Sequence, residues 1–393
     1  MATDFDVIVI GAGVIGTSVA HSLAKRRVGR IGVLEQSTLA AGATGKSSGV
    51  LRCHYGIPIV AAMAHQGLQW FRQVRQSYGL DVGYRDIGYV VGVGPHDVGA
   101  LRANVAMQQK LGIHTELLSP DDAQSLWPEM EMADFSLMAY EPDGGVADPT
   151  LTATAFYRLS KQFGVTYMFD QRVRQLQTHS GKVTGILTAD GQGWSAGAVV
   201  IAAGTDTPAL CDPLGITVPI RSQRAQLIVV NPGQLMPNRP VFSDLIALQY
   251  GRPEVNGTIL VGNSDHRAPE WVSEGPCPDG VTEDHIQLAI EKFMRRFPQW
   301  DTAQLLGGYS GCYEVTPDYN PVIGLTPVDG LYIAAGFSGH GFKLSPVVGD
   351  MVADLLVNHD DRNLDSYAFR LRRFEEQQLL VSQHPYGGAG QMR

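Results

Sequence analysis

Apolar runs of two lengths alternate along the first 35 residues. Residues 5–10 form a short β-branched run, as in a buried parallel strand. Residues 14–27 have the length and apolar spacing of a helix, and residues 31–35 repeat the strand pattern. Strand, helix and strand in this order predict a βαβ unit.

The same patterns predict further helices. Apolar residues recur at helical spacing in residues 59–78, and Asp148-Pro149 is a typical start for another helix. Residues 282–297 begin with acidic and end with basic side chains, as a helix dipole favours. Ser345-Pro346 predicts the start of a helix over residues 347–357.

A glycine-rich turn joins the first predicted strand to the first predicted helix. Gly11, Gly13 and Gly16 form G-x-G-x-x-G, in which glycines permit a tight turn, close approach of a pyrophosphate, and close helix–strand packing. The helix N-terminus adds free N–H groups and a positive dipole. Glu35 ends the next strand, where its carboxylate can accept both ribose hydroxyls of an adenosine. The pattern predicts a dinucleotide site.

This motif does not separate NAD from FAD, but two other segments favour FAD. Residues 42–56, "GATGKSSGVLRCHYG", form a small-residue loop against which a flat ring or ribityl chain could lie. Residues 332–350, "YIAAGFSGHGFKLSPVVGD", read as a second strand, small-residue turn and helix. FAD is long and gains from two such junctions, whereas NAD has little need of the second.

The α/β pattern appears in three separated blocks with β-rich sequence between them. We therefore predict an α/β fold with a Rossmann-type FAD-binding domain and a second α+β substrate domain that carries a mostly antiparallel sheet. The FAD-binding domain is expected to comprise residues 1–80, 145–220 and 305–380, and the substrate domain residues 81–144 and 221–304. Residues 381–393 form a tail, and its Gly-rich part from Tyr386 onward is expected to be disordered.

Composition narrows the class of protein. Lys and Arg number 30 against 39 Asp and Glu, a net charge of −9 without a basic run, which disfavours binding to nucleic acid or anionic membranes. The four cysteines are scattered without a CxxC pair, so we expect no disulfide framework, no metal site and a reducing compartment. No apolar run approaches the ~20 residues that span a bilayer, and the acidic "TDFD" start is unlike a signal peptide. A cytoplasmic protein is expected.

The chain resembles the FAD-dependent D-amino acid oxidase superfamily, in its sarcosine oxidase and glycine oxidase-like branch. The resemblance covers nearly the whole chain and is carried by "VIVIGAGVIGTSVA", "GATGKSSGVLR", "VVIAAG", "TPDYNPVIG" and "GFSGHGFK". The first segment is common to many flavoproteins, and the last two together are much more specific. The loop "TGKSSGVLR" looks most like heterotetrameric sarcosine oxidase β chains, and "GFSGHGFK" looks more like the monomeric enzymes.

The resemblance implies roles for individual residues. Arg52 and Lys343 match two cations that hold a substrate carboxylate above the flavin, Tyr250 and Tyr313 match tyrosines of that pocket, and His340 matches a histidine beside the isoalloxazine. The implied FAD contacts are Gly11, Gly13, Val14, Ile15, Gly16, Glu35, Gln36, Thr44, Gly45, Lys46, Ser47, Ser48, Val173, Ala203, Gly204, Gly339, His340, Gly341, Phe342 and Lys343.

Departures from the family pattern bear on how FAD is held. Gly311 stands where monomeric sarcosine oxidases carry the cysteine that tethers FAD, and Cys312 is one position away. Lys46 stands where dimethylglycine dehydrogenase-like chains have a tethering histidine. We therefore expect FAD to be bound without a covalent link.

Three functions fit these residues. The leading interpretation is an FAD-dependent oxidoreductase that converts a carboxylate-bearing secondary or primary amine, a sarcosine-like or free amino acid, to an imine by hydride transfer to flavin N5. A 2-hydroxy acid dehydrogenase would need the same two cations, Arg52 and Lys343, which we call the carboxylate clamp, and a base for the hydroxyl. An assembly factor or non-catalytic subunit that binds FAD would need no clamp. The expected partner is a small amine substrate, and a homo-oligomer or a place in a hetero-oligomeric complex is compatible with the sequence.

Overall fold

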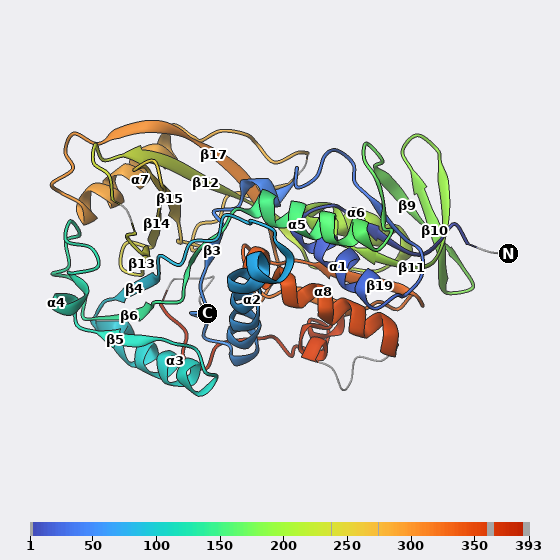
Figure 1. Cartoon of the computed structure of the whole chain (residues 1–393), viewed down its shortest axis with the longest axis horizontal. Coiled ribbons are helices and arrows are strands. Elements are labelled where there is room, and N and C mark those ends of the chain that lie inside the picture. Colours follow the sequence, from blue (N-terminus) through green and yellow to red (C-terminus); the bar gives the residue numbers. More distant parts are fainter. Residues whose placement is uncertain (1–2, 237, 274, 360–364, 388–393) are drawn as a thin grey trace.

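The chain folds around two large β-sheets that follow one another along the long axis of the molecule (Figure 1). The computed structural model describes residues 3–236, 238–273, 275–359 and 365–387. One sheet is largely parallel and the other largely antiparallel, each with its own helices. This confirms the predicted fold class, a Rossmann-type domain built from separate stretches of chain with an α+β domain beside it.

The first sheet contains the predicted βαβ unit. Its strand order is β18-β19-β11-β1-β2-β8, with β10 and β9 attached to β11. The run from β19 to β8 is parallel, whereas β18, β10 and β9 pair antiparallel. The strands are β1 (Phe5–Ile10), β2 (Ile31–Leu34), β8 (Thr166–Met168), β9 (Val173–His179), β10 (Lys182–Thr188), β11 (Gly193–Ile201), β18 (Val322–Leu325) and β19 (Leu331–Ala335).

Alternate residues of β1 enter two different apolar cores. Val7 and Val9 pack with the helices on one face, and Ile8 and Ile10 pack with residues of β9 and β10 on the other. Because both faces are covered, the strand is apolar at nearly every position. The helices of the first face are α1 (Val14–Lys25), α2 (Pro58–Tyr78), α5 (Pro149–Gln162) and α8 (Gly341–Asn358), and the short α6 (Thr207–Cys211) lies on the other.

Helix α8 begins six residues earlier than the sequence predicts. Ser345 and Pro346 lie inside the helix rather than at its start. Proline has no N–H for the carbonyl four residues before it, which here belongs to Phe342. The Ser345 hydroxyl donates to that carbonyl at 2.8 Å, so the helix continues through the proline with its acceptor satisfied.

The second sheet is nine-stranded and antiparallel except for the β13–β4 pair. Phe293 of α7 packs on one face, and Leu101 of α3 packs on the other. Its strands are β4 (Tyr89–Val93), β5 (Glu116–Leu118), β6 (Leu137–Glu141), β12 (Arg221–Asn231), β13 (Val241–Asp244), β14 (Gln249–Pro253), β15 (Ile259–Asn263), β16 (Trp271–Val272) and β17 (Gln304–Val315); its helices are α3 (Val98–Lys110), α4 (Pro120–Ala123) and α7 (Glu283–Arg296).

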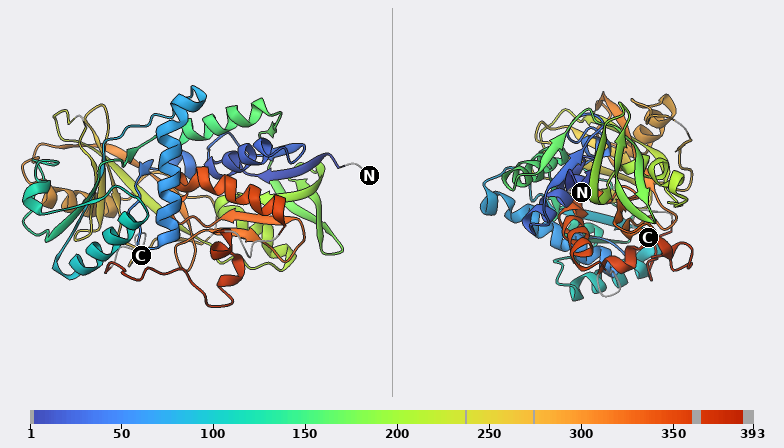
Figure 2. Two further views of the ribbon diagram at one scale, coloured as in Figure 1. Left: turned by 60° about the horizontal axis from the view of Figure 1, so that its bottom comes forward. Right: turned by 90° about the vertical axis from the view of Figure 1, so that its right-hand side faces the viewer.

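Several residues of the candidate active site, described below, lie in the segments that connect the two sheets. A two-stranded ribbon, β3 (Val50–Leu51) with β7 (Gly145–Val146), lies in this region, and α2 crosses between the two bodies (Figure 2). The short 3-10 helices are η1 (Ala43–Lys46), η2 (Pro95–Asp97), η3 (Gly204–Asp206), η4 (Asp212–Leu214), η5 (Asp365–Phe369) and η6 (Leu371–Arg373).

Two cysteines are paired, contrary to the sequence prediction. Cys277 and Cys312 form a disulfide with Cα atoms 5.7 Å apart. The loop after β16 folds back over β12 and β17, and Arg224 of β12 donates to its Asp279 and Gly280 carbonyls. This long-range packing brings together two residues 35 apart in sequence. The cysteine spacing is therefore no argument for a reducing compartment.

The segment before the C-terminus is packed against the molecule. Leu380 N donates to Asp318, and Asn104 donates to the His384 carbonyl. Tyr386, where the disordered tail was expected to begin, is only 2% exposed, because its ring fills the core between the second sheet and α3. Residues 388–393 of that tail lie outside the described residues. Within the described ranges, none of the helices has the length and apolarity needed to cross a bilayer.

Candidate active site

The glycine-rich turn after β1 leaves no room for side chains. Gly11 has φ of 103°, and a Cβ there would lie 2.4 Å from the Ala202 carbonyl oxygen. A Cβ on Gly16 would lie 1.9 Å from the Gly11 carbonyl oxygen. Both contacts are prohibitively short, so the close packing of α1 on β1 and β11 requires glycine. The turn therefore has the construction predicted for a pyrophosphate site.

Glu35 follows β2 and is held beside this turn. Its carboxylate accepts from Ala12 N at 2.8 Å and from Ser37 N at 3.0 Å. Each oxygen keeps a further lone pair, so the fixed carboxylate can still accept from ribose hydroxyls. The neighbouring Gln36 donates to Asp206 of η3 at 3.1 Å, which ties this corner to the end of β11.

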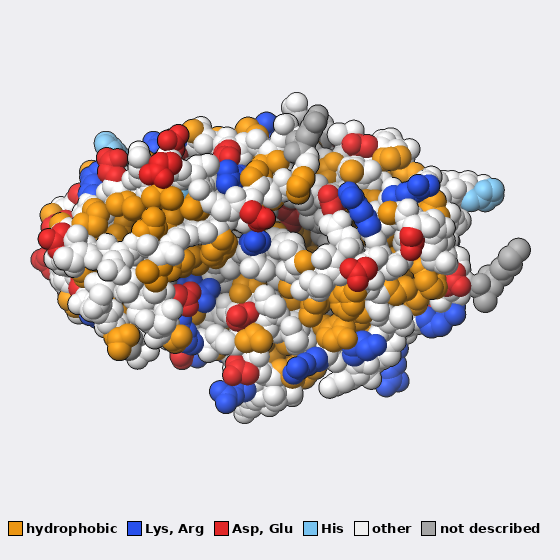
Figure 3. Space-filling model, turned by 90° about the horizontal axis from the view of Figure 1, so that it is seen from above, with side chains coloured by type: hydrophobic (Ala, Val, Ile, Leu, Met, Phe, Trp, Pro, Cys, Tyr) orange, Lys and Arg blue, Asp and Glu red, His pale blue; other side chains and the backbone are white. Residues whose placement is uncertain are grey.

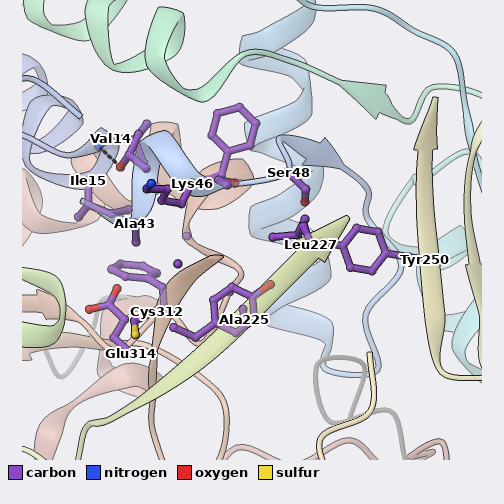
Figure 4. A pocket seen from close by; sticks show the side chains of 18 residues that line it. Val14, Ile15, Ala43, Lys46, Ser48, Ala225, Leu227, Tyr250, Cys312 and Glu314 are labelled. Atoms are coloured by element: carbon purple, nitrogen blue, oxygen red, sulfur yellow. Dashed lines mark hydrogen bonds between the residues drawn. The ribbon is translucent and has the colours of Figure 1, made fainter. Parts of the chain in front are cut away.

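A long cavity runs from the glycine turn to the second sheet (Figure 4). Val14 and Ile15 lie toward one end and Tyr250 toward the other, and Val14 N donates to Thr44 Oγ1 at 3.0 Å. Predicted FAD contacts lining it are Val14, Ile15, Thr44, Lys46, Ser47, Ser48, Gly339, Gly341 and Phe342. The cavity thus joins both glycine-rich junctions, and the residues along it would suit a long cofactor such as FAD.

Other predicted FAD residues shape this cavity from outside or lie at its ends. Gly45 packs against Ala40, where a Cβ would lie 2.8 Å from the carbonyl oxygen. Val173 begins β9 in the core that also contains Ile8 and Ile10, and Ala203 and Gly204 follow the end of β11. Their contacts with FAD stay predictions.

Glu314 is a cavity residue that the sequence analysis missed. Burial raises the pKa of its carboxyl to about 7, although N–H groups of Gly336 and Phe337 counteract this. Its Oε2 atom is buried and has no hydrogen-bond partner among the described residues, so it could accept from a hydroxyl of the bound cofactor. The pattern of apolar and polar residues in β17 does not mark Glu314, because this residue looks like an ordinary residue at the end of a strand.

A smaller cavity adjoins the first and contains the predicted carboxylate clamp. Arg52 and Lys343 both line it, together with Tyr250 and Tyr313. Both cavities share Ser47, Ser48, Tyr250, Tyr313, Gly339 and Phe342. The structure therefore brings four of the five predicted catalytic residues together beside the expected flavin ring.

One aromatic ring supports both cations of the clamp. The Arg52 Cζ atom lies 4.3 Å from the centroid of the Tyr55 ring, and Lys343 Nζ lies 5.9 Å from it. Arg52 and Lys343 are each 6% exposed. Burial first, and then the charge of Arg52, hold the pKa of Lys343 well below its usual range. Protonation of Lys343 beside Arg52 therefore needs a nearby anion, which a substrate carboxylate would supply.

Residues behind Arg52 fix its position. The guanidinium donates to the His54 carbonyl, and His54 Nε2 lies 2.8 Å from the Tyr386 hydroxyl. Glu141, at the end of β6, accepts from Cys53 N at 2.8 Å and is 3% exposed. Burial raises the pKa of the Glu141 carboxyl to about 7. Burial, followed by the charge of Arg52, lowers the pKa of His54 to about 3. No local sequence signal marks Glu141, since β6 joins this loop only through the fold.

His340 lies one layer behind the clamp. Its Nδ1 atom is 3.1 Å from the Tyr55 hydroxyl, and the residue is 4% exposed. Burial, followed by the charges of Lys343 and Arg52, holds its pKa well below the usual range, so the ring is neutral. Its position supports the ring of Tyr55, and direct contact with flavin stays a prediction.

Comparisons with known proteins show the family to which the chain belongs. Residues 6–355 match the family model described as FAD dependent oxidoreductase. The chain is 26% identical to the sarcosine oxidase subunit beta of Arthrobacter sp, over 96% of this chain and 92% of that protein. It is also 26% identical to the monomeric sarcosine oxidase of Streptomyces avermitilis, over 91% of this chain and 94% of that protein.

A solved structure shows the same fold. L-proline dehydrogenase from P. horikoshii superimposes with a TM-score of 0.87 at 24% identity, over 96% of this chain and all of that one. The predicted resemblance is confirmed, and with it an FAD-dependent oxidoreductase related to sarcosine and glycine oxidases. The chain belongs to the FAD dependent oxidoreductase family.

Proposed function

We propose that this protein oxidises the C–N bond of a small amine that bears a carboxylate, such as an N-methyl or free amino acid, to an imine. The observation that carries the proposal is the meeting of Arg52 and Lys343 in a cavity adjoining the one that fits FAD. A structural flavin would need no such pair of buried cations. The names of its relatives, sarcosine oxidases among them, support the same chemistry.

The clamp sets the position of the substrate. A guanidinium can bind a carboxylate through two parallel hydrogen bonds, and Lys343 adds a second charge from the first turn of α8. Bound FAD supplies the hydride acceptor. Holding the carboxylate at this end of the smaller cavity places the neighbouring carbon toward Tyr250 and Tyr313, at the boundary between the two cavities.

The substrate amine must also lose a proton, because a hydride leaves poorly from carbon beside an ammonium. Lys343 is a candidate acceptor, since its depressed pKa favours the neutral amine before the carboxylate arrives. Buried phenols are poor acceptors in comparison, because burial raises the pKa of Tyr55 to about 12.

Anaerobic reduction of the holoenzyme tests the proposal. N-methyl and free amino acids should bleach the flavin absorbance, whereas the corresponding amines without a carboxylate should not. Bleaching by 2-hydroxy acids alone would instead establish a hydroxy acid dehydrogenase. A flavin that no member of either panel reduces would favour a non-catalytic FAD-binding subunit. Because one relative is named as a subunit, the assay should include the protein in its native assembly.

A further inference from the structure

The smaller cavity continues beyond the clamp into a polar wall. Three hydroxyl side chains contribute to this wall: Tyr89, Ser243 and Ser264. They are buried, at 1%, 5% and 8% exposure. None of them belongs to the FAD cavity described above. We call Tyr89, Ser243 and Ser264 the hydroxyl wall.

The second sheet fixes the hydroxyl wall. Tyr89 begins β4, and Ser243 lies on the neighbouring parallel strand β13. Ser264 directly follows β15, and its backbone N–H donates to the Leu248 carbonyl at 2.8 Å. Because strand pairing sets these positions, the hydroxyls are preorganised rather than carried on a free loop.

Of the hydroxyl wall, the Tyr89 hydroxyl most needs a further hydrogen-bond partner. Its oxygen is inaccessible to solvent, and by strict geometry it has no hydrogen-bond partner among the described residues. Burial raises its pKa, whereas the charge of Arg52 and an interaction with the adjacent Ser243 side chain lower it. A buried hydroxyl without a good partner is unfavourable. A ligand hydroxyl that approaches Tyr89 and Ser243 from the cavity could donate to one and accept from the other.

From this arrangement we infer that the hydroxyl wall binds a hydroxyl group on the substrate side chain. The substrate class is thus a small hydroxylated amino acid, and the inference rests on the proposed function for the amine. An apolar side chain would bury the Tyr89 hydroxyl against carbon. A second carboxylate is disfavoured, because the described lining holds only Arg52 and Lys343 as cations and the first carboxylate engages both.

The wall is close enough to the clamp for a small ligand to reach both. The Arg52 Cζ atom lies 5.9 Å from the centroid of the Tyr89 ring. A hydroxyl two or three bonds from the carboxylate-bearing carbon therefore suits this spacing, and long side chains do not.

Ligand binding without turnover provides the first test. Flavin absorbance changes in the holoenzyme should be titrated with propionate and with 3-hydroxypropionate, which differ only by the hydroxyl. We expect the hydroxylated acid to bind at least tenfold more tightly. The double variant Tyr89→Phe/Ser243→Ala should remove that difference, whereas Tyr167→Phe, at a half-buried tyrosine whose hydroxyl lies 2.8 Å from that of Ser160, should retain it. Equal affinities in the wild type would overturn the inference.

A single variant keeps the test sound if the double variant loses FAD. Ser264→Ala should then reduce the preference in a protein with normal flavin content. A preference that persists unchanged in every variant that retains FAD would also overturn the inference, because it would place recognition elsewhere.

Anaerobic reduction separates this inference from the proposed function. N-methylserine should reduce the flavin at lower concentration than N-methylalanine. If amines reduce the flavin but the apolar member of each pair binds as well, the hydroxyl wall has no such role and the proposed function stands. If no amine reduces the flavin but 3-hydroxypropionate keeps its advantage, the proposed function fails and the hydroxyl wall is supported as a binding site.

Discussion

Arg52 and Lys343 are paired by the fold although their charges repel. Each is buried, both lie over the ring of Tyr55, and Arg52 is further anchored to the His54 carbonyl. Such an arrangement is unfavourable without an anion and favourable with one. The energy of ligand binding is therefore expected to be concentrated in these two side chains.

Removing either cation should weaken carboxylate binding. Arg52→Ala or Lys343→Met is expected to reduce binding by about 2–4 kcal/mol, because a charge-assisted partner is lost in a desolvated site. Spectral titration with a carboxylate inhibitor measures this, and flavin content should stay normal. Lys161→Met, on the exposed surface of α5, is the matched control. Unchanged affinity in both clamp variants would refute the assignment.

Carboxylate binding should weaken as the pH rises. The pKa of Lys343 in the free protein is held well below its usual range, so raising the pH removes the proton that the carboxylate needs. The logarithm of the dissociation constant should therefore increase with pH in the wild type. Lys343→Met should lose that dependence, and a pH profile identical in both proteins would contradict the prediction.

Glu141 should make stability depend on pH. Its folded pKa is about 7 against an ordinary value of 4.5, so the protonated form is favoured by folding. This contribution is fully present below pH 4.5 and is lost as the pH rises to about 7. Urea unfolding across this range should show the wild type losing stability relative to Glu141→Gln. Parallel stability curves would show that Glu141 does not titrate in this window.

At the scale of elements, helix α8 shows how a local signal can mislead. Ser345-Pro346 has the form of a helix start, yet the helix begins at Gly341. The Ser345 hydroxyl supplies the donor that Pro346 lacks, and the Ser345 carbonyl accepts from Ser18 of α1 at 2.6 Å. Tertiary packing thus overrides the preference of proline for the first turn.

Ser345→Ala should destabilise the protein, because Pro346 has no N–H to replace the lost hydroxyl donor. The Phe342 carbonyl would lose its donor in a fully buried position, which is expected to lower the free energy of unfolding by about 1–3 kcal/mol. Urea denaturation of the holoprotein measures the change. The double variant Ser345→Ala/Pro346→Ala should recover part of it, because alanine restores the backbone N–H; no recovery would argue against this role.

The disulfide should stabilise the loop that follows β16. Cys277→Ser/Cys312→Ser is expected to reduce stability by roughly 2–4 kcal/mol, because the unfolded chain gains freedom. Thermal unfolding with and without reductant should reproduce this difference in the wild type. The double variant should not respond to reductant, and an equal response in both proteins would place the effect elsewhere.

The elements differ in how far the sequence determines them. The βαβ unit and helix α7 follow from local patterns of apolar residues and caps, and both are found close to their predicted bounds. The disulfide, Glu141 and the hydroxyl wall depend on which strands pair, and a single sequence holds little information on such long-range pairing. Arg52 and Lys343 could be found because both lie in glycine-rich segments that resemble known flavoproteins.

At the scale of the whole molecule, charged side chains of both signs share the face seen from above. Lys and Arg are interspersed with Asp and Glu on the surface seen in Figure 3. This matches the moderate net charge of −9 and gives no extended basic region on that surface for a polyanion. Under the proposed function, recognition would instead be concentrated in the buried cavity that contains Arg52 and Lys343.

The composition of that site makes a ligand behave as a reversible cross-link. In sequence, Arg52 and Lys343 are separated by residues 53–342, although both line one cavity. The second sheet contributes Tyr89 and Ser243 to the same cavity. A bound molecule of a few atoms therefore restrains the ends of a closed loop that spans most of the polypeptide. Mass action sets the size of the restraint: ligand at 100 times its dissociation constant stabilises by about 2.7 kcal/mol. A shift in melting temperature is thus a direct assay for the native substrate, independent of electron transfer.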